Sequence, residues 1–145
     1  MMKLSPKYVL LVAALVSLIG CATGGPKYAD LNPTIPSKPD TGRIFVYRTA
    51  LLGAAVQPAV RVNGEAVGNA VPNGFFFIDR APGDYVISTS TEVDRNLSLT
   101  LDKGDTRFVR LNISMGFFVG HVYPELIEPA TGEKEIQDCH YTGSK

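Results

Sequence analysis

The sequence predicts an all-β domain, arranged as an antiparallel β-sandwich or a partly open barrel of about seven to eight strands. Short runs rich in β-branched and aromatic residues recur along the chain, and turn-forming residues separate them. Only residues 1–20 contain an apolar stretch that suits a helix. With 14 glycines and 10 prolines among 145 residues, the composition favours many turns around one modest core.

Residues 1–20 are predicted to be a helical signal peptide that precedes the fold. Lys3 and Lys7 supply positive charge ahead of an apolar stretch, residues 8–19, which only Ser17 interrupts. A membrane-spanning helix needs about 20 apolar residues, so this stretch is too short to cross a bilayer comfortably. It is typical of an export signal.

The apolar stretch ends in Leu18, Ile19, Gly20 and Cys21, a pattern that resembles the lipobox of bacterial lipoproteins. The resemblance implies that the Cys21 thiol receives a diacylglyceryl group and that the signal is cut between Gly20 and Cys21. Such chemistry needs the nucleophilic sulfur of cysteine. Acyl chains on Cys21 would hold the mature protein on a membrane of the bacterial cell envelope. By analogy with enterobacterial lipoproteins, Ala22 in place of aspartate favours the outer membrane.

Residues 21–41 are expected to form a flexible, disordered tether that starts at the lipidated cysteine. They contain four prolines and two glycines and show no periodic apolar pattern. Such a tether would reach about 70 Å when pulled straight. The alternative is that part of it packs along the domain through Tyr28, Leu31 and Ile35.

The β-sandwich domain is predicted over residues 42–141, with a short tail at 142–145. Residues 42–48, which read GRIFVYR, are its first expected strand because they are rich in β-forming residues. Residues 49–57 are expected to form a loop or a bulge.

The Asn-Gly pair at 63–64 is the strongest hairpin signal in the chain. Both residues tolerate the positive φ of a type I′ turn, and short apolar runs flank them. In the register that such a turn sets, Val60 faces Val67 and Val62 faces Glu65.

Two further hairpins are expected at residues 74–91 and 95–114, with turns at Pro82-Gly83 and at 102–105. Their side chains alternate, so one face should be buried and the other wet. Tyr85, Ile87, Thr89 and Thr91 share one face of the first hairpin, and the apolar face of the second carries Leu97, Leu99, Leu101, Val109, Leu111 and Ile113.

The last part of the chain is less regular. Residues 117–127 are expected to form one more strand, broken or edged by Pro124. Residues 133–140 suit either a strand or a short helix.

The order RIFVYR, VRVNGEAVG, GFFFIDRAPGDYVIS and LSLTLDKGDTRFVRLNI is similar to a family of small bacterial lipoproteins that carry an uncharacterised domain. More loosely, it resembles the PEGA and carboxypeptidase-regulatory-like β-sandwiches. The resemblance covers roughly residues 41–113 and rests on structural motifs. It implies an immunoglobulin-like or PEGA-like sandwich and brings no active site with it.

The charged residues exclude a nucleic-acid-binding surface. The 14 basic and 14 acidic side chains balance, and no run of like charge occurs. The two histidines, His121 and His140, are far apart in the sequence and show no zinc-binding spacing. We therefore expect no catalytic residues, no cofactor and no metal site.

Cys139 is an odd cysteine if lipid consumes Cys21. Its neighbour His140 would point to the opposite face of an extended strand, so the pair does not form a thiolate–imidazole dyad. Cys139 is expected to be a partly exposed terminal thiol or to pair with a thiol on another chain.

Consecutive phenylalanines suggest a candidate interaction patch. Phe75, Phe76 and Phe77 form one run, and Phe117 and Phe118 form another. Neighbouring residues on a strand point to opposite faces, so either some rings are exposed to a protein partner or an acyl chain, or a second layer covers them.

The function expected from these features is that of a lipid-anchored, non-catalytic binding or accessory module in the periplasm or at the cell surface. Its partners would be the membrane, through the acyl chains on Cys21, and a protein of the envelope. The alternative is an envelope enzyme, or an inhibitor of an envelope hydrolase, that acts on cell-wall or lipid substrates.

Overall fold

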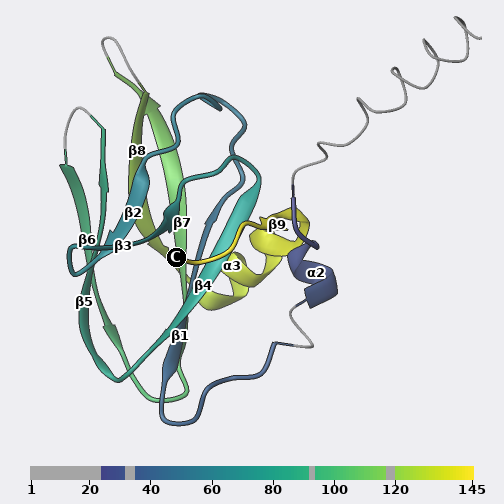
Figure 1. Cartoon of the computed structure of the whole chain (residues 1–145), viewed down its shortest axis with the longest axis vertical. Helices are drawn as coiled ribbons and strands as arrows, with labels where there is room; N and C mark the ends of the chain where they lie inside the picture. Colours follow the sequence, from purple (N-terminus) through teal and green to yellow (C-terminus); the bar gives the residue numbers. More distant parts are fainter. Residues whose placement is uncertain (1–23, 32–34, 92–93, 117–119) are drawn as a thin grey trace, which may run out of the picture.

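The computed structural model describes residues 24–31, 35–91, 94–116 and 120–145. Within these residues, nine strands form two sheets that stack as a sandwich and do not close into a barrel (Figure 1). The predicted all-β sandwich is confirmed. The expected signal peptide, with Gly20 and Cys21, lies outside the described residues.

The larger sheet has five strands in the order β8-β7-β1-β4-β9. Two of its pairs, β1–β4 and β7–β8, run antiparallel, whereas β1 pairs in parallel with β7, and β4 pairs in parallel with β9. The strand β8 is at one edge, which explains how the sheet accepts Pro124 within it. The bounds are β1 Gly42–Arg48, β4 Gly74–Arg80, β7 Thr106–Met115, β8 Gly120–Ile127 and β9 His140–Tyr141.

The smaller sheet has four antiparallel strands in the order β3-β2-β5-β6. Its strands are β2 Ala59–Val62, β3 Glu65–Asn69, β5 Gly83–Ser90 and β6 Asp94–Leu101.

The β2–β3 hairpin turns at Asn63 and Gly64, which both have positive φ as expected. Val62 lies opposite Glu65, which confirms the predicted register next to the turn. The prediction that Val60 faces Val67 is wrong, because a bulge after Val60 shifts the register and places Gly68 opposite it.

The main core lies between the two sheets and is built by alternating side chains. The predicted alternation holds here, since β5 and β6 bury Ile87, Leu99 and Leu101 while their intervening residues are largely exposed. The buried members of this core are Ile44, Val46, Val60, Val62, Val67, Ala70, Phe76, Ile78, Ile87, Leu99, Leu101, Val109, Leu111 and Val122.

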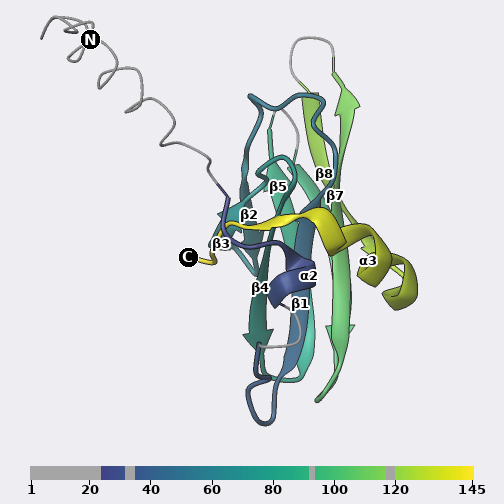
Figure 2. The ribbon, with the colours of Figure 1, turned by 90° about the vertical axis from the view of Figure 1, so that its right-hand side faces the viewer.

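A second buried layer covers the outer face of the five-stranded sheet. The helices α2 (Tyr28–Leu31) and α3 (Pro129–Glu135) and the 3-10 helix η2 (Ile136–Asp138) lie on this face (Figure 2). As a result, β1 is buried along its whole length. The residues of this layer are Tyr28, Phe45, Tyr47, Phe75, Phe108, Ile127, Ile136 and Cys139. Within the described part of the chain, no helix is both long and apolar enough to cross a membrane.

Residues 24–31, which the sequence placed in a flexible tether, pack onto the domain. The backbone amide of Gly25 donates to the carbonyl of Tyr141 at 3.0 Å, and that of Tyr28 donates to the carbonyl of Cys139 at 2.9 Å. Tyr28 is buried and Leu31 packs beside it. For this segment, the structure therefore shows the alternative in which the chain runs along the sandwich.

Candidate functional site

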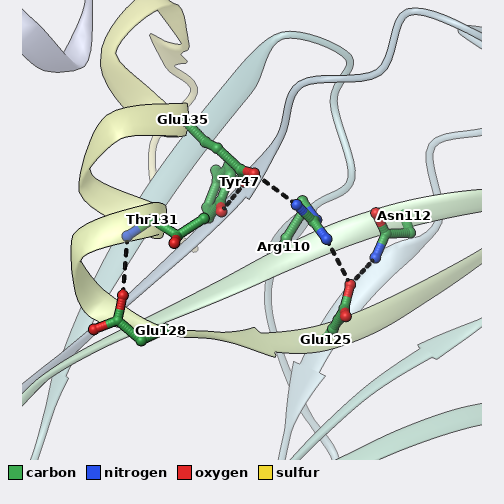
Figure 3. Close-up of polar contacts among 7 residues, drawn as sticks. All are labelled: Tyr47, Arg110, Asn112, Glu125, Glu128, Thr131 and Glu135. Carbon is green, nitrogen blue, oxygen red and sulfur yellow. Dashed lines mark hydrogen bonds and ion pairs between the residues drawn. The ribbon is translucent and has the colours of Figure 1, made fainter.

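The most connected polar cluster of the outer layer is centred on Glu135 of α3 (Figure 3). The Tyr47 hydroxyl donates to Oε2 of Glu135 at 2.7 Å, and Arg110 donates to its Oε1 at the same distance. Arg110 also donates to Glu125 at 2.9 Å, and Asn112 donates to the same oxygen at 2.6 Å. The cluster thus joins α3 to β1, β7 and β8.

The pKa shifts in this cluster point to a structural role. Burial and the hydrogen bond to Glu135 raise the pKa of Tyr47 above its ordinary value. Hydrogen bonds from Arg110 and Asn112 lower the pKa of Glu125. A general acid or base works best with a pKa near neutrality, but both groups are shifted away from it. The cluster therefore keeps fixed charges and holds α3 in place.

Two further contacts fix α3. Its start is capped by Glu128, whose side chain accepts from the Thr131 amide at 3.2 Å, and Pro129 occupies the first turn. The Tyr28 hydroxyl donates to Glu133 at 2.7 Å.

The candidate phenylalanine patch does not form an exposed surface where the structure describes it. Phe76 is buried in the core between the sheets, and Phe75 is buried in the outer layer. Phe77 packs against the outer layer, with the Arg43 guanidinium 4.4 Å from its ring centroid. The second layer therefore covers Phe75 and partly covers Phe77, whereas Phe117 and Phe118 lie outside the described residues.

Cys139 is buried rather than partly exposed. Its residue is 1% exposed, and its Sγ lies 3.9 Å from the Arg48 carbonyl oxygen. Burial, together with the charges of Asp138 and Glu135, raises the pKa of Cys139 to about 11. In this conformation the thiol is out of reach of a thiol on another chain, so the expected exposure is corrected.

The two histidines lie in separate places. Nδ1 of His140 is 2.9 Å from the Gly25 carbonyl oxygen, and Nδ1 of His121 is 3.2 Å from the Thr91 hydroxyl. Among the residues that the structure describes, no group of three or more His, Cys, Asp or Glu side chains could hold a metal ion.

A hollow of about 420 Å³ opens between β6 and β8, where the edges of the two sheets meet. Its lining is polar apart from one proline and includes one cationic side chain. Among the described residues that line it, none carries a carboxylate, a thiol or an imidazole. The lining residues are Arg95, Asn96, Ser114, Tyr123 and Pro124.

Three exposed apolar side chains gather at one end of the sandwich. Leu51 and Leu52 are 67% and 61% exposed in loop 49–58, which joins β1 to β2, and Met115 is 76% exposed at the end of β7. Gly53 of the loop packs closely against β7, because a Cβ at this position would overlap the side chain of Ile113. We call Leu51, Leu52 and Met115 the apolar end.

Arg48 gives loop 49–58 a fixed shape. Its guanidinium is fully buried and donates to the backbone carbonyl groups of Leu52, Gly53, Val56 and Ala70 at 2.7 to 3.1 Å. From the sequence, residues 49–57 are expected only to form a loop or a bulge. The missed signal is a run of ten uncharged residues, 49–58, that starts directly after an arginine and contains two adjacent leucines.

A family model described as a protein of unknown function (DUF2846) matches residues 38–122. The match covers the strands β1 to β7 and the start of β8, and it ends before α3. It supports the uncharacterised domain expected from the sequence, while the lipoprotein and PEGA resemblances stay predictions. No curated protein matched the chain.

Proposed function

This chain belongs to the DUF2846 family of proteins of unknown function, and we propose that it is a lipid-anchored, non-catalytic binding module of the bacterial cell envelope. The favoured location is the outer membrane, and the proposed partner is another envelope protein. The observation that carries the proposal is the placement of the lipobox-like Leu18–Cys21 directly ahead of the folded domain.

The described fold starts three residues after Cys21. Gly24 already packs against the domain, because a Cβ added there would lie 3.0 Å from the His140 side chain. Removal of residues 1–20 would therefore leave Cys21 next to a domain whose described part is intact. A lipoprotein needs this arrangement, since the signal peptide leaves while the lipidated cysteine stays on the chain.

The polar side chains of the outer layer support a binding role over a catalytic one. Tyr28 and Tyr47 donate to α3 carboxylates, and Arg110 forms ion pairs with Glu125 and Glu135. These groups are engaged in holding the layer together. Partner contacts are left to the loops, the sheet edges and the hollow between β6 and β8.

Expression of the full chain and of Cys21→Ala in a bacterium that lipidates its own exported proteins tests the anchor. We expect the wild-type chain in the membrane fraction, with acyl mass on Cys21 and no residues 1–20. Cys21→Ala should stay unprocessed or leave the membrane. Cys139→Ala is the matched control, because it removes the other cysteine and should keep the lipid. Wild-type processing and membrane retention of Cys21→Ala would refute the proposal.

Cross-linking in intact cells tests the binding role. A protein that co-purifies with the wild-type chain, and not with Cys21→Ala, would be the expected partner. Recovery of the anchored chain without any cross-linked protein would count against a binding module.

A further inference from the structure

We propose that the apolar end rests on the same membrane that anchors Cys21, with Leu51, Leu52 and Met115 in the interfacial region of the bilayer. The inference rests on the proposed lipid anchoring and adds the orientation of the domain. The module would then lie on the membrane instead of standing away from it on a long tether.

The chain length between anchor and fold sets the first constraint. Only three residue steps separate Cys21 from Gly24, which already packs on the domain. Three fully extended residues span at most about 11 Å. The reach of about 70 Å expected for a twenty-residue tether is therefore lost, and the domain must stay close to the bilayer surface.

The point at which the chain enters the fold sets the second constraint. Gly24 lies against His140 in β9, and His140 pairs with Gly74, the first residue of β4. Gly74 lies opposite Arg48, the last residue of β1, and loop 49–58 starts from there. The short connection to Cys21 is thus attached beside the ends of β1 and β4 from which loop 49–58 starts, and Met115 lies farther along β7 in the same direction.

The distribution of charge sets the third constraint. At the opposite end, shown at the bottom of Figure 1, the connections before β1, between β4 and β5 and between β6 and β7 are rich in charge. Loop 49–58 and residues 111–116 carry no charged side chain. The charged residues of the opposite end are Lys38, Asp40, Arg43, Asp79, Arg80, Asp84, Asp102, Lys103, Asp105 and Arg107.

These differences decide which end approaches the lipid. Exposed leucine and methionine side chains gain free energy by leaving water, whereas charged side chains lose their hydration in the hydrocarbon region. Asp94 and Arg95, the first two residues of β6, are charged residues near this end, and Arg95 lines the hollow. Apolar contact also adds to an acyl anchor, which holds weakly when it has a single chain.

The loop is shaped before it meets the membrane. The Arg48 guanidinium bonds to carbonyls on both sides of the loop, and Gly53 rests on Ile113. Leu51 and Leu52 are therefore held outward without a loss of loop entropy on contact.

Lipid-borne quenching tests the orientation on the full-length, lipidated protein in phosphatidylcholine–phosphatidylglycerol vesicles. A fluorophore is attached to Leu52→Cys or, as the matched exposed control at the opposite end, to Lys103→Cys. The unmodified chain is the labelling blank, because lipid occupies the sulfur of Cys21 and Cys139 is buried. Nitroxide groups on the acyl chains should quench the label at 52 severalfold more than the label at 103.

The outcomes separate this inference from the anchor itself. Equal quenching at both positions in vesicle-bound protein overturns the orientation and leaves the anchor standing. Failure of the full chain to associate with the vesicles overturns both. Shielding of position 52 from aqueous iodide without quenching by the lipid nitroxide would show that protein covers the apolar end, and it would also overturn the bilayer contact.

Discussion

The Tyr28 hydroxyl donates a hydrogen bond to Oε2 of Glu133 at 2.7 Å and so joins α2 to α3 across 105 residues of sequence. The Tyr28 ring packs edge-on against Phe45 and Phe75, with centroids 5.2 and 5.4 Å away. Burial and the bond to Glu133 raise the pKa of Tyr28, so the hydroxyl stays protonated and keeps donating. This one side chain fastens the N-terminal segment to the sandwich.

Substitutions at Tyr28 should separate the contribution of its ring to the free energy of unfolding from that of its hydroxyl. Tyr28→Phe keeps the ring contacts and is expected to lower the free energy of unfolding by about 1 to 2 kcal/mol. Tyr28→Ala removes both and should cost about 3 to 5 kcal/mol. Urea unfolding measures both values. Tryptic cleavage after Lys27 should also become faster in Tyr28→Ala, and an unchanged cleavage rate would contradict the role of Tyr28 as a fastener.

Arg48→Lys should loosen loop 49–58. Lysine brings one nitrogen in place of the two guanidinium nitrogens that serve four carbonyls, so some buried carbonyls lose their donor. We expect a loss of about 2 to 4 kcal/mol in the free energy of unfolding. Hydrogen exchange at the Val56 amide, which bonds to the Gly53 carbonyl at 2.9 Å, should speed up. Slow exchange retained in Arg48→Lys would refute this role.

The sheet faces could be predicted from the sequence because their cause is local. A strand with one buried face repeats every two residues, and Leu97, Leu99 and Leu101 display that period directly. The turn at 63–64 was likewise predictable, since asparagine and glycine tolerate positive φ. The bulge after Val60 depends on how β2 meets its partner strands, and no local pattern announces it.

The outer layer escaped prediction for a physical reason. The helix α3 reads PATGEKE and has no apolar stripe. It packs on the sheet through Gly132, and its Glu133 and Glu135 side chains accept hydrogen bonds from tyrosines. Tyr28 sits in a segment whose prolines and glycines are typical of a tether. The consecutive phenylalanines 75–77 left two possibilities open, exposed rings or a second layer, and did not indicate what would form that layer.

Acid should destabilise the protein in part through Glu125. Its folded pKa lies below the ordinary value of 4.5, because Arg110 and Asn112 donate to the carboxylate. The resulting stabilisation is fully present above that ordinary value and is lost as the pH falls through the folded pKa. Glu125→Gln should therefore flatten the decline in the free energy of unfolding between about pH 5 and pH 3. A slope equal to that of the wild type would contradict the assignment.

The Cys139 thiol should react slowly in the folded protein. Burial raises its pKa to about 11, so the thiol is protonated near neutral pH and sheltered from reagents. The stabilisation linked to this shift is present below the ordinary value of 9 and is lost as the pH rises through about 11. A colorimetric disulfide reagent at pH 8 should label Cys139 only after urea unfolding. Rapid labelling without urea, or a disulfide-linked dimer on a non-reducing gel, would contradict its burial.

Gly132→Ala should destabilise the protein although alanine favours helices. In an exposed helix this change gains about 1 kcal/mol. At Gly132, however, the added Cβ would overlap the side chain of Phe108, on which α3 rests. Overpacking of this kind costs about 1 to 3 kcal/mol. It would also strain the hydrogen bonds that Glu133 and Glu135 accept. The net loss should therefore be up to about 2 kcal/mol in urea unfolding.

A double-mutant cycle identifies the cause of that loss. Phe108→Ala removes Cγ and Cδ1, two of the three atoms nearest to the added Cβ, so it should cost less in the Gly132→Ala background than in the wild type. Thr131→Ala is the matched control, because it changes an exposed neighbour in the same helix. It should leave the free energy of unfolding within about 0.5 kcal/mol of the wild-type value. Additive effects of Gly132→Ala and Phe108→Ala would show that α3 does not rest on Phe108 through Gly132.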